Sequence, residues 1–345
     1  MQVLSTAMLS TPFYDPNKSY EENWETGPFG AFADGKELGQ EKRIPFGIAA
    51  GPLLNAKFIK AALDKGFDIC VYKTVRSYEK KSNQWPNVLQ VDIKGDLTLE
   101  QAKKGVTTKK GFSEPLAITN SFGNPCYPPE IWQPDMAQAV SYARPGQQVW
   151  GMIEGDNLDD WVLAGRLINE TRIHAIEANL SCPNEGDKVK RLLCYDTDKS
   201  RDIVYAIKNK IGDTPLMVKI SYFENQEELQ DLVKKLGNIV QGFSAINTIP
   251  APVYDEHGKQ ALPGGEWRLK SGICGTPIKW AGLEMTKHLY EIRKSIKANY
   301  QICGVGGVTT PADYHEYRSA GADLVMSATG SMWNPHLAIE IKKTL

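Results

Sequence analysis

Short apolar runs that end in small or polar residues recur along the whole chain. Several of them, such as LMVKIS and DLVMSAT, are apolar at nearly every position, which is typical of strands covered on both faces. The runs span residues 44–50, 68–74, 147–154, 174–181, 215–221, 243–249, 300–306 and 323–328. The pattern therefore predicts eight buried, parallel strands.

Helix-like stretches, with apolar residues three and four positions apart, separate most of these runs. They span residues 55–65, 158–170, 199–211, 227–236, 278–296 and 311–320. A doubly wound sheet would have about five or six strands, so eight strands alternating with helices favour a TIM (β/α)8 barrel of the α/β class. We expect one barrel domain over residues 44–345.

Three segments exceed a minimal barrel. Residues 1–43 form an N-terminal extension that we expect to pack on the barrel, and residues 76–146 and 250–267 are long insertions. Both insertions follow the carboxyl ends of predicted strands, where barrel enzymes build their active sites. The insertions are therefore expected at the carboxyl-terminal face.

The charge balance and the absence of long apolar runs argue against a nucleic-acid-binding or membrane protein. The chain has 40 Lys and Arg against 41 Asp and Glu, so no net field attracts nucleic acid or an anionic membrane. The N-terminus has neither a basic start nor a long apolar run, and no stretch reaches the roughly 18 apolar residues of a membrane span. We interpret the chain as a cytoplasmic enzyme with a small-molecule substrate.

The cysteines do not form a recognisable set. They are Cys70, Cys126, Cys182, Cys194, Cys274 and Cys303, at irregular spacings and without a C-x-x-C pair. Disulfides and a metal site are therefore not expected. Cys182 differs from an ordinary buried cysteine because it lies between two asparagines, in NLSCPN, where an apolar run gives way to a polar loop.

Candidate chemistry gathers at the strand ends. Glycine-rich turns follow the seventh and eighth strands and suit a bound phosphate. Lys73 and Lys219 interrupt buried strands, where an unpaired ammonium is costly, so each is expected to meet an anion or to act as a Schiff-base nucleophile. Asparagine amides carry a donor and an acceptor, which suits the edge of a pyrimidine ring; the candidates are Asn120, Asn179, Asn184 and Asn247.

The motifs PFGIAAG, YKTV, NSFGNP, NLSCPN, VKIS, INT, ICGVGGV and ATG occur in this order from about residue 45 to the C-terminus. Together they resemble the dihydroorotate dehydrogenase family, in particular its soluble class, which has a cysteine base. The resemblance implies a TIM barrel that binds FMN and oxidises dihydroorotate to orotate in pyrimidine biosynthesis. It also implies a homodimer.

The resemblance assigns roles to single residues. Cys182 corresponds to the base that removes the C5 proton while hydride leaves C6 for the flavin, and Lys73 would serve both catalysis and binding. The remaining substrate-binding candidates are Asn120, Phe122, Gly123, Asn124, Asn179, Asn184, Asn247 and Thr248. The cofactor-binding candidates are Ala49, Ala50, Gly51, Lys73, Thr74, Asn179, Lys219, Asn247, Gly275, Gly306, Gly307, Ala328 and Thr329.

Three alternatives stay open at this point. The segments GKQALPGGEW and SGICGTPI are similar to dihydropyrimidine dehydrogenase, a related flavin enzyme that acts on dihydrouracil-like substrates, although a histidine would then be expected in place of Asn184. A more distant alternative is an aldolase-type barrel that uses Lys73 or Lys219. The last is a non-catalytic barrel that binds a phosphate ligand and buries an inert Cys182.

Overall fold

The computed structural model describes residues 14–32, 44–112, 116–181 and 192–345 of the chain. Eight parallel strands close into a barrel in the order β1-β13-β12-β9-β8-β7-β6-β2. They are β1 (Phe46–Ile48), β2 (Ile69–Val75), β6 (Gln148–Ile153), β7 (Ala175–Asn179), β8 (Leu216–Ile220), β9 (Gly242–Ala245), β12 (Gln301–Val305) and β13 (Leu324–Ser327). Each overlaps one range predicted from the sequence, so the TIM barrel is confirmed.

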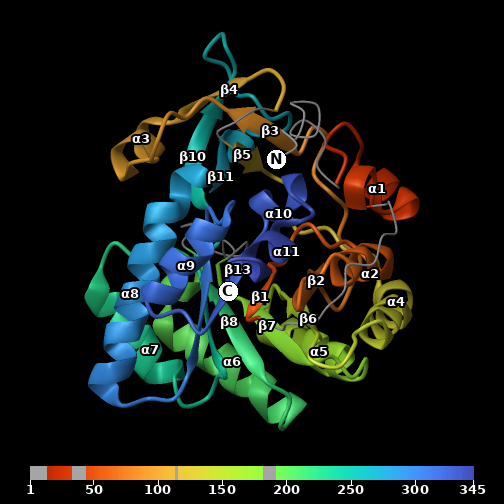
Figure 1. Ribbon diagram of the computed structural model, residues 1–345, viewed down its shortest axis with the longest axis vertical. Coiled ribbons are helices and arrows are strands. Elements are labelled where there is room, and N and C mark those ends of the chain that lie inside the picture. The colour runs from red at the N-terminus through yellow and green to blue at the C-terminus, as the bar shows by residue number, and fades with distance from the viewer. Residues whose placement is uncertain (1–13, 33–43, 113–115, 182–191) are drawn as a thin grey trace.

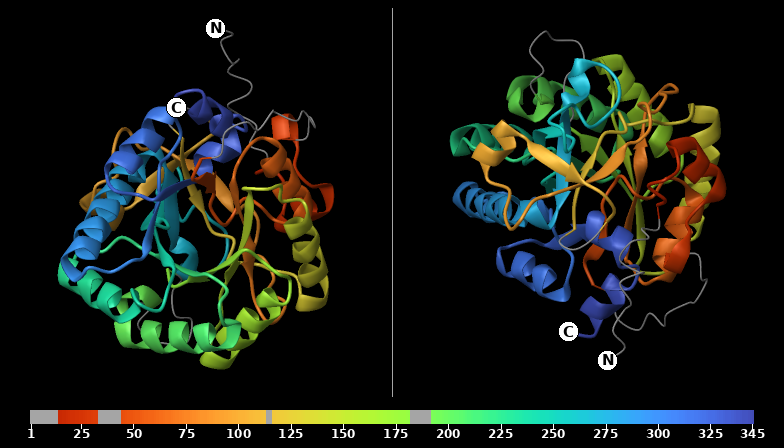
Figure 2. Two further views of the ribbon diagram at one scale, coloured as in Figure 1. Left: turned by 60° about the horizontal axis from the view of Figure 1, so that its bottom comes forward. Right: turned by 90° about the horizontal axis from the view of Figure 1, so that it is seen from above.

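Helices surround the strands, as the two views in Figure 2 show. The six predicted helices are present as α2 (Ala56–Asp64), α5 (Leu158–Asn169), α6 (Thr197–Ile211), α7 (Gln226–Leu236), α8 (Lys279–Ile296) and α9 (Pro311–Ser319). A further helix, α4 (Pro129–Ser141), lies within the 76–146 insertion, where none was predicted, and contains Pro134. The short α10 (Thr329–Trp333) and α11 (Leu337–Lys342) follow the last strand.

Strand side chains alternate between two separate environments. Ile69 and Val71 of β2, and Trp150 and Met152 of β6, belong to a small cluster inside the barrel. The residues between them pack outward against the helices in the larger core. Because successive side chains of a strand point to opposite faces, this register decides which residues reach the barrel axis.

The two insertions fold together into a second, small sheet. It contains β3 (Val88–Val91), β4 (Val106–Lys109) and β5 (Ala117–Asn120) from the first insertion, and β10 (Ile249–Tyr254) and β11 (Lys270–Gly275) around the second. β5 pairs antiparallel with both β3 and β11, so segments about 150 residues apart in sequence become neighbours. In the view of Figure 1 the strands of this sheet lie above the labelled barrel strands. The sequence predicted the position of the insertions but not this pairing.

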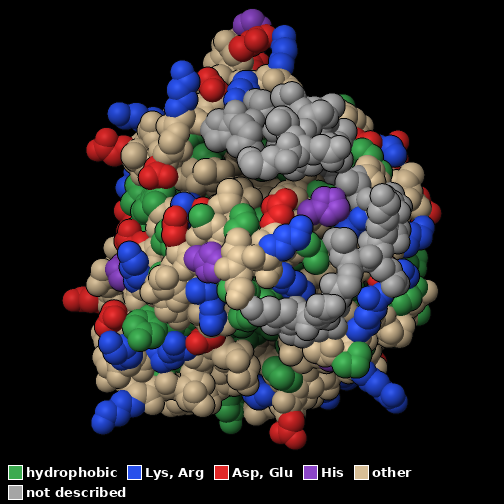
Figure 3. All heavy atoms as spheres, viewed as in Figure 1, with side chains coloured by type: hydrophobic (Ala, Val, Ile, Leu, Met, Phe, Trp, Pro, Cys, Tyr) green, Lys and Arg blue, Asp and Glu red, His purple; other side chains and the backbone are tan. Residues whose placement is uncertain are grey.

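Short helical segments complete the connections. α3 (Leu99–Lys104) lies between β3 and β4, and single 3₁₀ turns occur at Gly30–Phe32, Leu193–Tyr195, Glu266–Leu269 and Thr276–Ile278. No helix in the described part of the chain combines the length and apolar character that crossing a membrane requires. Acidic and basic side chains are interspersed over the face seen in Figure 3, as the near-neutral charge balance leads one to expect.

The described part of the N-terminal segment packs on the barrel. Its helix α1 (Tyr20–Thr26) begins with a capping box formed by Ser19 and Glu22. Trp24 packs against Tyr127 with ring centroids 4.8 Å apart, and the Trp24 carbonyl accepts a 2.9 Å hydrogen bond from Asn55 Nδ2, the cap residue of α2. The boundary at residue 43 lies outside the described residues and stays a prediction.

Arg268 holds the two insertions together. Its side chain is 1% exposed and donates to the carbonyls of Gln84, Pro86 and Ser121 at 2.7, 3.2 and 3.0 Å. It also donates to Asn87 Oδ1 at 2.9 Å. One guanidinium directly after the second insertion therefore donates to several backbone acceptors of the first.

We expect Arg268→Met to destabilise the small sheet more than the barrel. Several part-buried carbonyls and Asn87 Oδ1 lose this donor, which should lower the free energy of unfolding by roughly 2–4 kcal/mol. Hydrogen exchange should accelerate in β5 and β11 and remain slow in the barrel strands. Arg166→Met, which removes an exposed ion pair with Glu170 on α5, is the matched control and should leave exchange unchanged. Equal acceleration in the sheet and the barrel would contradict this role.

Candidate active site

A cavity of about 890 Å³ lies between the carboxyl ends of the barrel strands and the small sheet. Its floor and sides come from the ends of β1, β2, β6, β7, β8, β12 and β13, and its cover includes β5 and β11. The volume falls within the roughly 300–1,000 Å³ of small-molecule sites. This is the face on which active sites of this fold are built.

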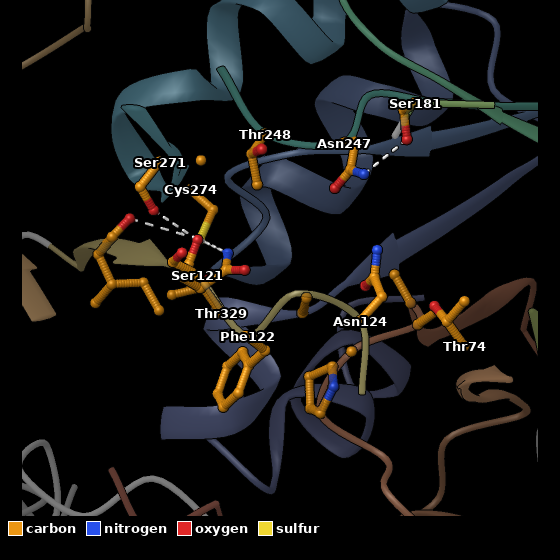
Figure 4. A pocket seen from close by; sticks show the side chains of 18 of the residues that line it. Thr74, Ser121, Phe122, Asn124, Ser181, Asn247, Thr248, Ser271, Cys274 and Thr329 are labelled. Carbon is orange, nitrogen blue, oxygen red and sulfur yellow. Dashed lines mark hydrogen bonds between the residues drawn. The ribbon is translucent and has the colours of Figure 1, made fainter. Parts of the chain in front are cut away.

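Almost all of the candidate residues from the sequence line this one cavity. They are Ala49, Ala50, Gly51, Lys73, Thr74, Asn120, Phe122, Gly123, Asn124, Asn179, Lys219, Asn247, Thr248, Gly275, Gly306, Gly307, Ala328 and Thr329. The other two candidates, Cys182 and Asn184, lie outside the described residues. These candidates come from nine separate segments of the chain that meet at one place, and Figure 4 shows several of the lining residues from close by.

Lys73 and Lys219 reach the cavity from inside the barrel. They continue the inward-facing series Ile69, Val71 on β2 and Met217 on β8. The two lysines are 5% and 4% exposed. Among the described residues, Lys219 forms neither a hydrogen bond nor an ion pair. A desolvated ammonium at the cavity wall favours an electron-rich or anionic ligand group there.

A buried polar cluster lies near Lys219 in the barrel interior. Lys219, Ser244 and Cys303 are register partners on adjacent strands β8, β9 and β12. Burial raises the pKa of the Cys303 thiol to about 12, with the Lys219 charge lowering it and the Glu177 charge raising it. The Cys303 thiol is therefore neutral at physiological pH and acts as a small buried side chain.

Three glycines of the cavity have backbone conformations that other residues rarely adopt. Gly51, Gly306 and Gly307 have φ angles of +134°, +128° and +67°. A Cβ on Gly307 would lie 2.9 Å from the backbone nitrogen of Lys279, whereas the space over Gly51 is open. Only glycine allows the chain to turn this tightly at the strand ends, so that backbone lies directly at the cavity.

Three of the asparagines are joined by a chain of hydrogen bonds. Asn247 Nδ2 donates to Ser181 Oγ at 2.6 Å, the bond drawn in Figure 4, and Ser181 Oγ donates to Asn179 Oδ1 at 2.7 Å. Asn179 Nδ2 and Asn124 Nδ2 then donate to the same oxygen, Glu154 Oε2, at 3.0 and 2.8 Å. The amides of the cavity therefore have defined orientations.

Sequence reasoning missed Ser181, Glu154 and its partner Arg76. A signal for Glu154 was available, because it is two residues beyond Met152 and four beyond Trp150, which face the barrel axis. An acidic residue at the next inward position, directly after a buried strand, is expected to face the open end of the barrel, where the cavity lies. Nothing in the sequence indicates that Arg76 pairs with it.

Asn120 belongs to the opposite wall of the cavity. It ends β5 of the small sheet, and its Nδ2 lies 3.5 Å from Cys274 Sγ of β11. In Figure 4 Cys274, Ser121 and Thr329 lie together, apart from Asn247 and Ser181. The expected convergence of asparagines on one cavity is thus found for Asn120, Asn179 and Asn247, on two separate walls.

We expect Cys274 to react slowly with iodoacetamide although it lines the cavity. Burial raises the pKa of its thiol, against hydrogen bonds with Thr329 and Asn120 that lower it. Only the thiolate attacks, so the rate should be low at pH 7 and rise about tenfold per pH unit below the pKa. Mass spectrometry of the Cys274 peptide measures the rate, with unfolded protein as the reference. A rate that does not change between pH 7 and 9 would contradict the neutral thiol.

Comparison with known proteins gives consistent matches. The family model described as "Dihydroorotate dehydrogenase" matches residues 36–345. A dihydroorotate dehydrogenase of Dictyostelium discoideum is 33% identical over 365 aligned residues, which cover 96% of this chain and 97% of that protein.

Bacterial catalytic subunits of the protein named dihydroorotate dehydrogenase B (NAD(+)) are also similar. The subunit from Petrotoga mobilis is 31% identical over 55% of this chain and 59% of its own length. The subunit from Brachyspira hyodysenteriae is 28% identical over 73% of this chain and 78% of its own length. The Dictyostelium protein thus matches over nearly the whole chain, and the two bacterial subunits match over part of it.

Proposed function

The chain belongs to the dihydroorotate dehydrogenase family, and on that premise we propose that it oxidises dihydroorotate to orotate with a bound FMN. The observation that carries the proposal is the single cavity at the barrel's carboxyl-terminal face, where the inward lysines, the oriented amides and the open glycine turns meet. Dihydroorotate is a small anion with a ring of alternating carbonyl and N–H groups. Ammonium and amide groups are the partners that such a molecule requires.

The residues of the cavity fit a flavin, on which the family depends. FMN would be held by Ala49, Ala50 and Gly51 at the first strand end, where the space over Gly51 is open. Its phosphate suits the turn at Gly306 and Gly307, where positive φ angles bring the backbone to the cavity, together with Thr329, which lines the same cavity. Lys219, which has no partner among the described residues, supports the proposal because it supplies a cation to the electron-rich edge of the ring.

The substrate is proposed to contact the amides between Lys73 and the small sheet. Asn120 and Asn124 come from β5 of the small sheet and the loop that follows it, and Asn179 and Asn247 come from the barrel side of the cavity. The Lys73 ammonium would bind the substrate carboxylate or the flavin edge, and Phe122 and Thr248 would complete the walls. Groups on both sides hold the ring in a fixed orientation, as transfer of a proton and a hydride requires.

Cys182 is proposed as the general base. It follows Ser181 directly, and Ser181 lines the cavity and accepts the hydrogen bond of Asn247. The Cys182 thiolate would take the proton from C5 of dihydroorotate and later release it to water. When bound, FMN supplies the acceptor for the hydride that leaves C6. Loss of that proton and hydride forms the C5–C6 double bond of orotate, so atoms and electrons balance.

The proposed function is tested by adding dihydroorotate to the purified protein without oxygen. We expect the protein to carry FMN and its flavin absorbance to bleach, because the two electrons of the substrate pass to the cofactor. Dihydrouracil is the matched control: it lacks the carboxylate and should bleach the flavin far more slowly. Bleaching by dihydrouracil alone would favour the dihydropyrimidine dehydrogenase alternative. A protein that cannot take up flavin and is trapped by borohydride with a carbonyl substrate would favour the aldolase alternative.

Cys182→Ala is expected to retain FMN and to lose reduction by dihydroorotate. Without the base, the rate constant of flavin reduction should fall by about 10²–10⁴-fold, while the flavin content stays that of the wild type. Single-turnover absorbance measurements give this rate constant. Cys194→Ala is the control, because Cys194 is buried and does not line the cavity. Undiminished reduction in Cys182→Ala would rule out the assignment of the base.

The cytoplasmic location and the homodimer stay predictions. The even mixture of acidic and basic residues supports an aqueous compartment. The homodimer rests on the resemblance to the family. Gel filtration with light scattering measures the oligomeric state directly.

A further inference from the structure

Glu154 lies at the end of β6 and points into the cavity. It is 5% exposed and continues the inward-facing positions Trp150 and Met152. A carboxylate in such a place is costly unless it is paired and hydrogen-bonded. Arg76, which is 1% exposed, forms an ion pair with Glu154 Oε1. The charge of Glu154 is thereby offset at Oε1, the oxygen that the asparagines do not use.

The other oxygen of Glu154 determines the orientation of two amides. Asn179 Nδ2 and Asn124 Nδ2 both donate to Oε2, at 3.0 and 2.8 Å. An ionised carboxylate accepts hydrogen bonds and has none to donate, so each amide must present its nitrogen and not its oxygen. Asn124 reaches this position from a left-handed conformation, with φ of +49°. Glu154 therefore fixes which end of each amide points away from it.

The orientation of Asn179 also determines that of Asn247, through Ser181. Asn179 presents its nitrogen to Glu154, so its oxygen remains to accept from Ser181 Oγ, at 2.7 Å. Ser181 Oγ in turn accepts from Asn247 Nδ2, at 2.6 Å. Every donor in this chain points toward Glu154. Figure 4 shows the Asn247 nitrogen turned toward Ser181 and its oxygen turned the other way, where it could accept from a ring N–H of the substrate.

We propose that Glu154 is a positioning residue that sets the orientation of the substrate-binding amides of Asn124, Asn179 and Asn247. The inference rests on the proposed function, since these amides are taken to bind dihydroorotate and orotate. It adds a residue that acts through its neighbours: Glu154 Oε2 accepts two amide hydrogens and Oε1 accepts from Arg76. The specificity of the cavity for a ring with its N–H groups in fixed positions then depends on a carboxylate that orients the amides beside it.

If Glu154 served only to neutralise Arg76, different results would be expected. Arg76 has a second carboxylate partner, Asp156, at 2.5 Å, whose side chain is 42% exposed. If Glu154 only neutralised Arg76, the loss of either partner would affect stability and leave the recognition of orotate unchanged. Among the described residues, Asp156 bonds with Arg76 and Tyr78 and with none of the three asparagines, so it is the matched control.

The test is orotate binding to the FMN-loaded Glu154→Gln variant, followed by the change in flavin absorbance. A glutamine amide has one acceptor and one donor end, so it cannot accept from Arg76 on one side and from both asparagines on the other. We expect the Kd of orotate to rise about tenfold or more, since two or more oriented hydrogen bonds are disturbed. The KM of dihydroorotate should rise similarly, with a smaller change in kcat. Asp156→Asn should keep the Kd within about twofold of the wild type.

A double-mutant cycle separates orientation from general damage. If Glu154 acts through Asn124, then Asn124→Ala should weaken orotate binding in the wild type and have a much smaller effect in Glu154→Gln. Equal effects of Asn124→Ala in both backgrounds would overturn the proposal. So would wild-type orotate affinity in Glu154→Gln, or equal weakening in Glu154→Gln and Asp156→Asn.

Ser181→Ala provides the second variant if Glu154→Gln does not fold. It breaks the chain between Asn179 and Asn247 and leaves the Glu154–Arg76 ion pair intact. We expect about a fivefold to tenfold weaker binding of orotate, and an unchanged Kd would overturn the proposal. A wild-type protein that takes up FMN but neither binds orotate nor is reduced by dihydroorotate would instead refute the proposed function, which keeps the two failures distinct.

Discussion

The closed barrel imposes one constraint on everything else in this molecule: only alternate side chains of each strand face the axis, and the space there is filled. Below the cavity these positions hold apolar residues such as Val71, Met152 and Met217. At the next inward position toward the carboxyl end, the same strands carry Lys73, Glu154 and Lys219. The packed apolar layer supports the polar layer above it and separates it from water below.

The small sheet forms the other side of the cavity, and its position depends on the barrel because its strands start from barrel strand ends. Its strands come from two insertions that leave the barrel at separate strand ends, and β5 and β11 pair across them. Arg268 supplies donors to the carbonyls of the first insertion, so the cover of the cavity is held by hydrogen bonds as well as by apolar contacts. A cover built in this way keeps Asn120 and Gly275 opposite the barrel residues with which they share the cavity.

The polar layer is ordered by charge. Arg76 offsets the buried carboxylate of Glu154, and the carboxylate orients the amides that follow along the ends of β7 and β9. An amide by itself offers either end to a ligand, whereas one that donates to a carboxylate offers its oxygen in a defined direction. The site is thus organised before any ligand binds, which reduces the cost of ordering it during catalysis.

The sequence by itself determined the barrel and most of the cavity. Apolar runs and helical spacing identify all eight strands, because buried parallel strands are apolar on both faces. Strand-end residues such as Lys73, Asn179 and Gly307 could be found in advance, because in this fold strand ends converge on one face. The motifs of the family, from PFGIAAG to ATG, led to the same residues.

Only the tertiary structure decided which of these residues touch. The pairing of β5 with β11 joins insertions that carry no sequence signal for each other. The helix α4 was not predicted; it contains Pro134, which locally disfavours a helix interior, and burial of Trp132 and Met136 in the core outweighs that preference. The link from Arg76 through Glu154 to Asn247 could not be predicted from the sequence. Hydrogen bonds between distant segments depend on register and side-chain direction, which no local pattern encodes.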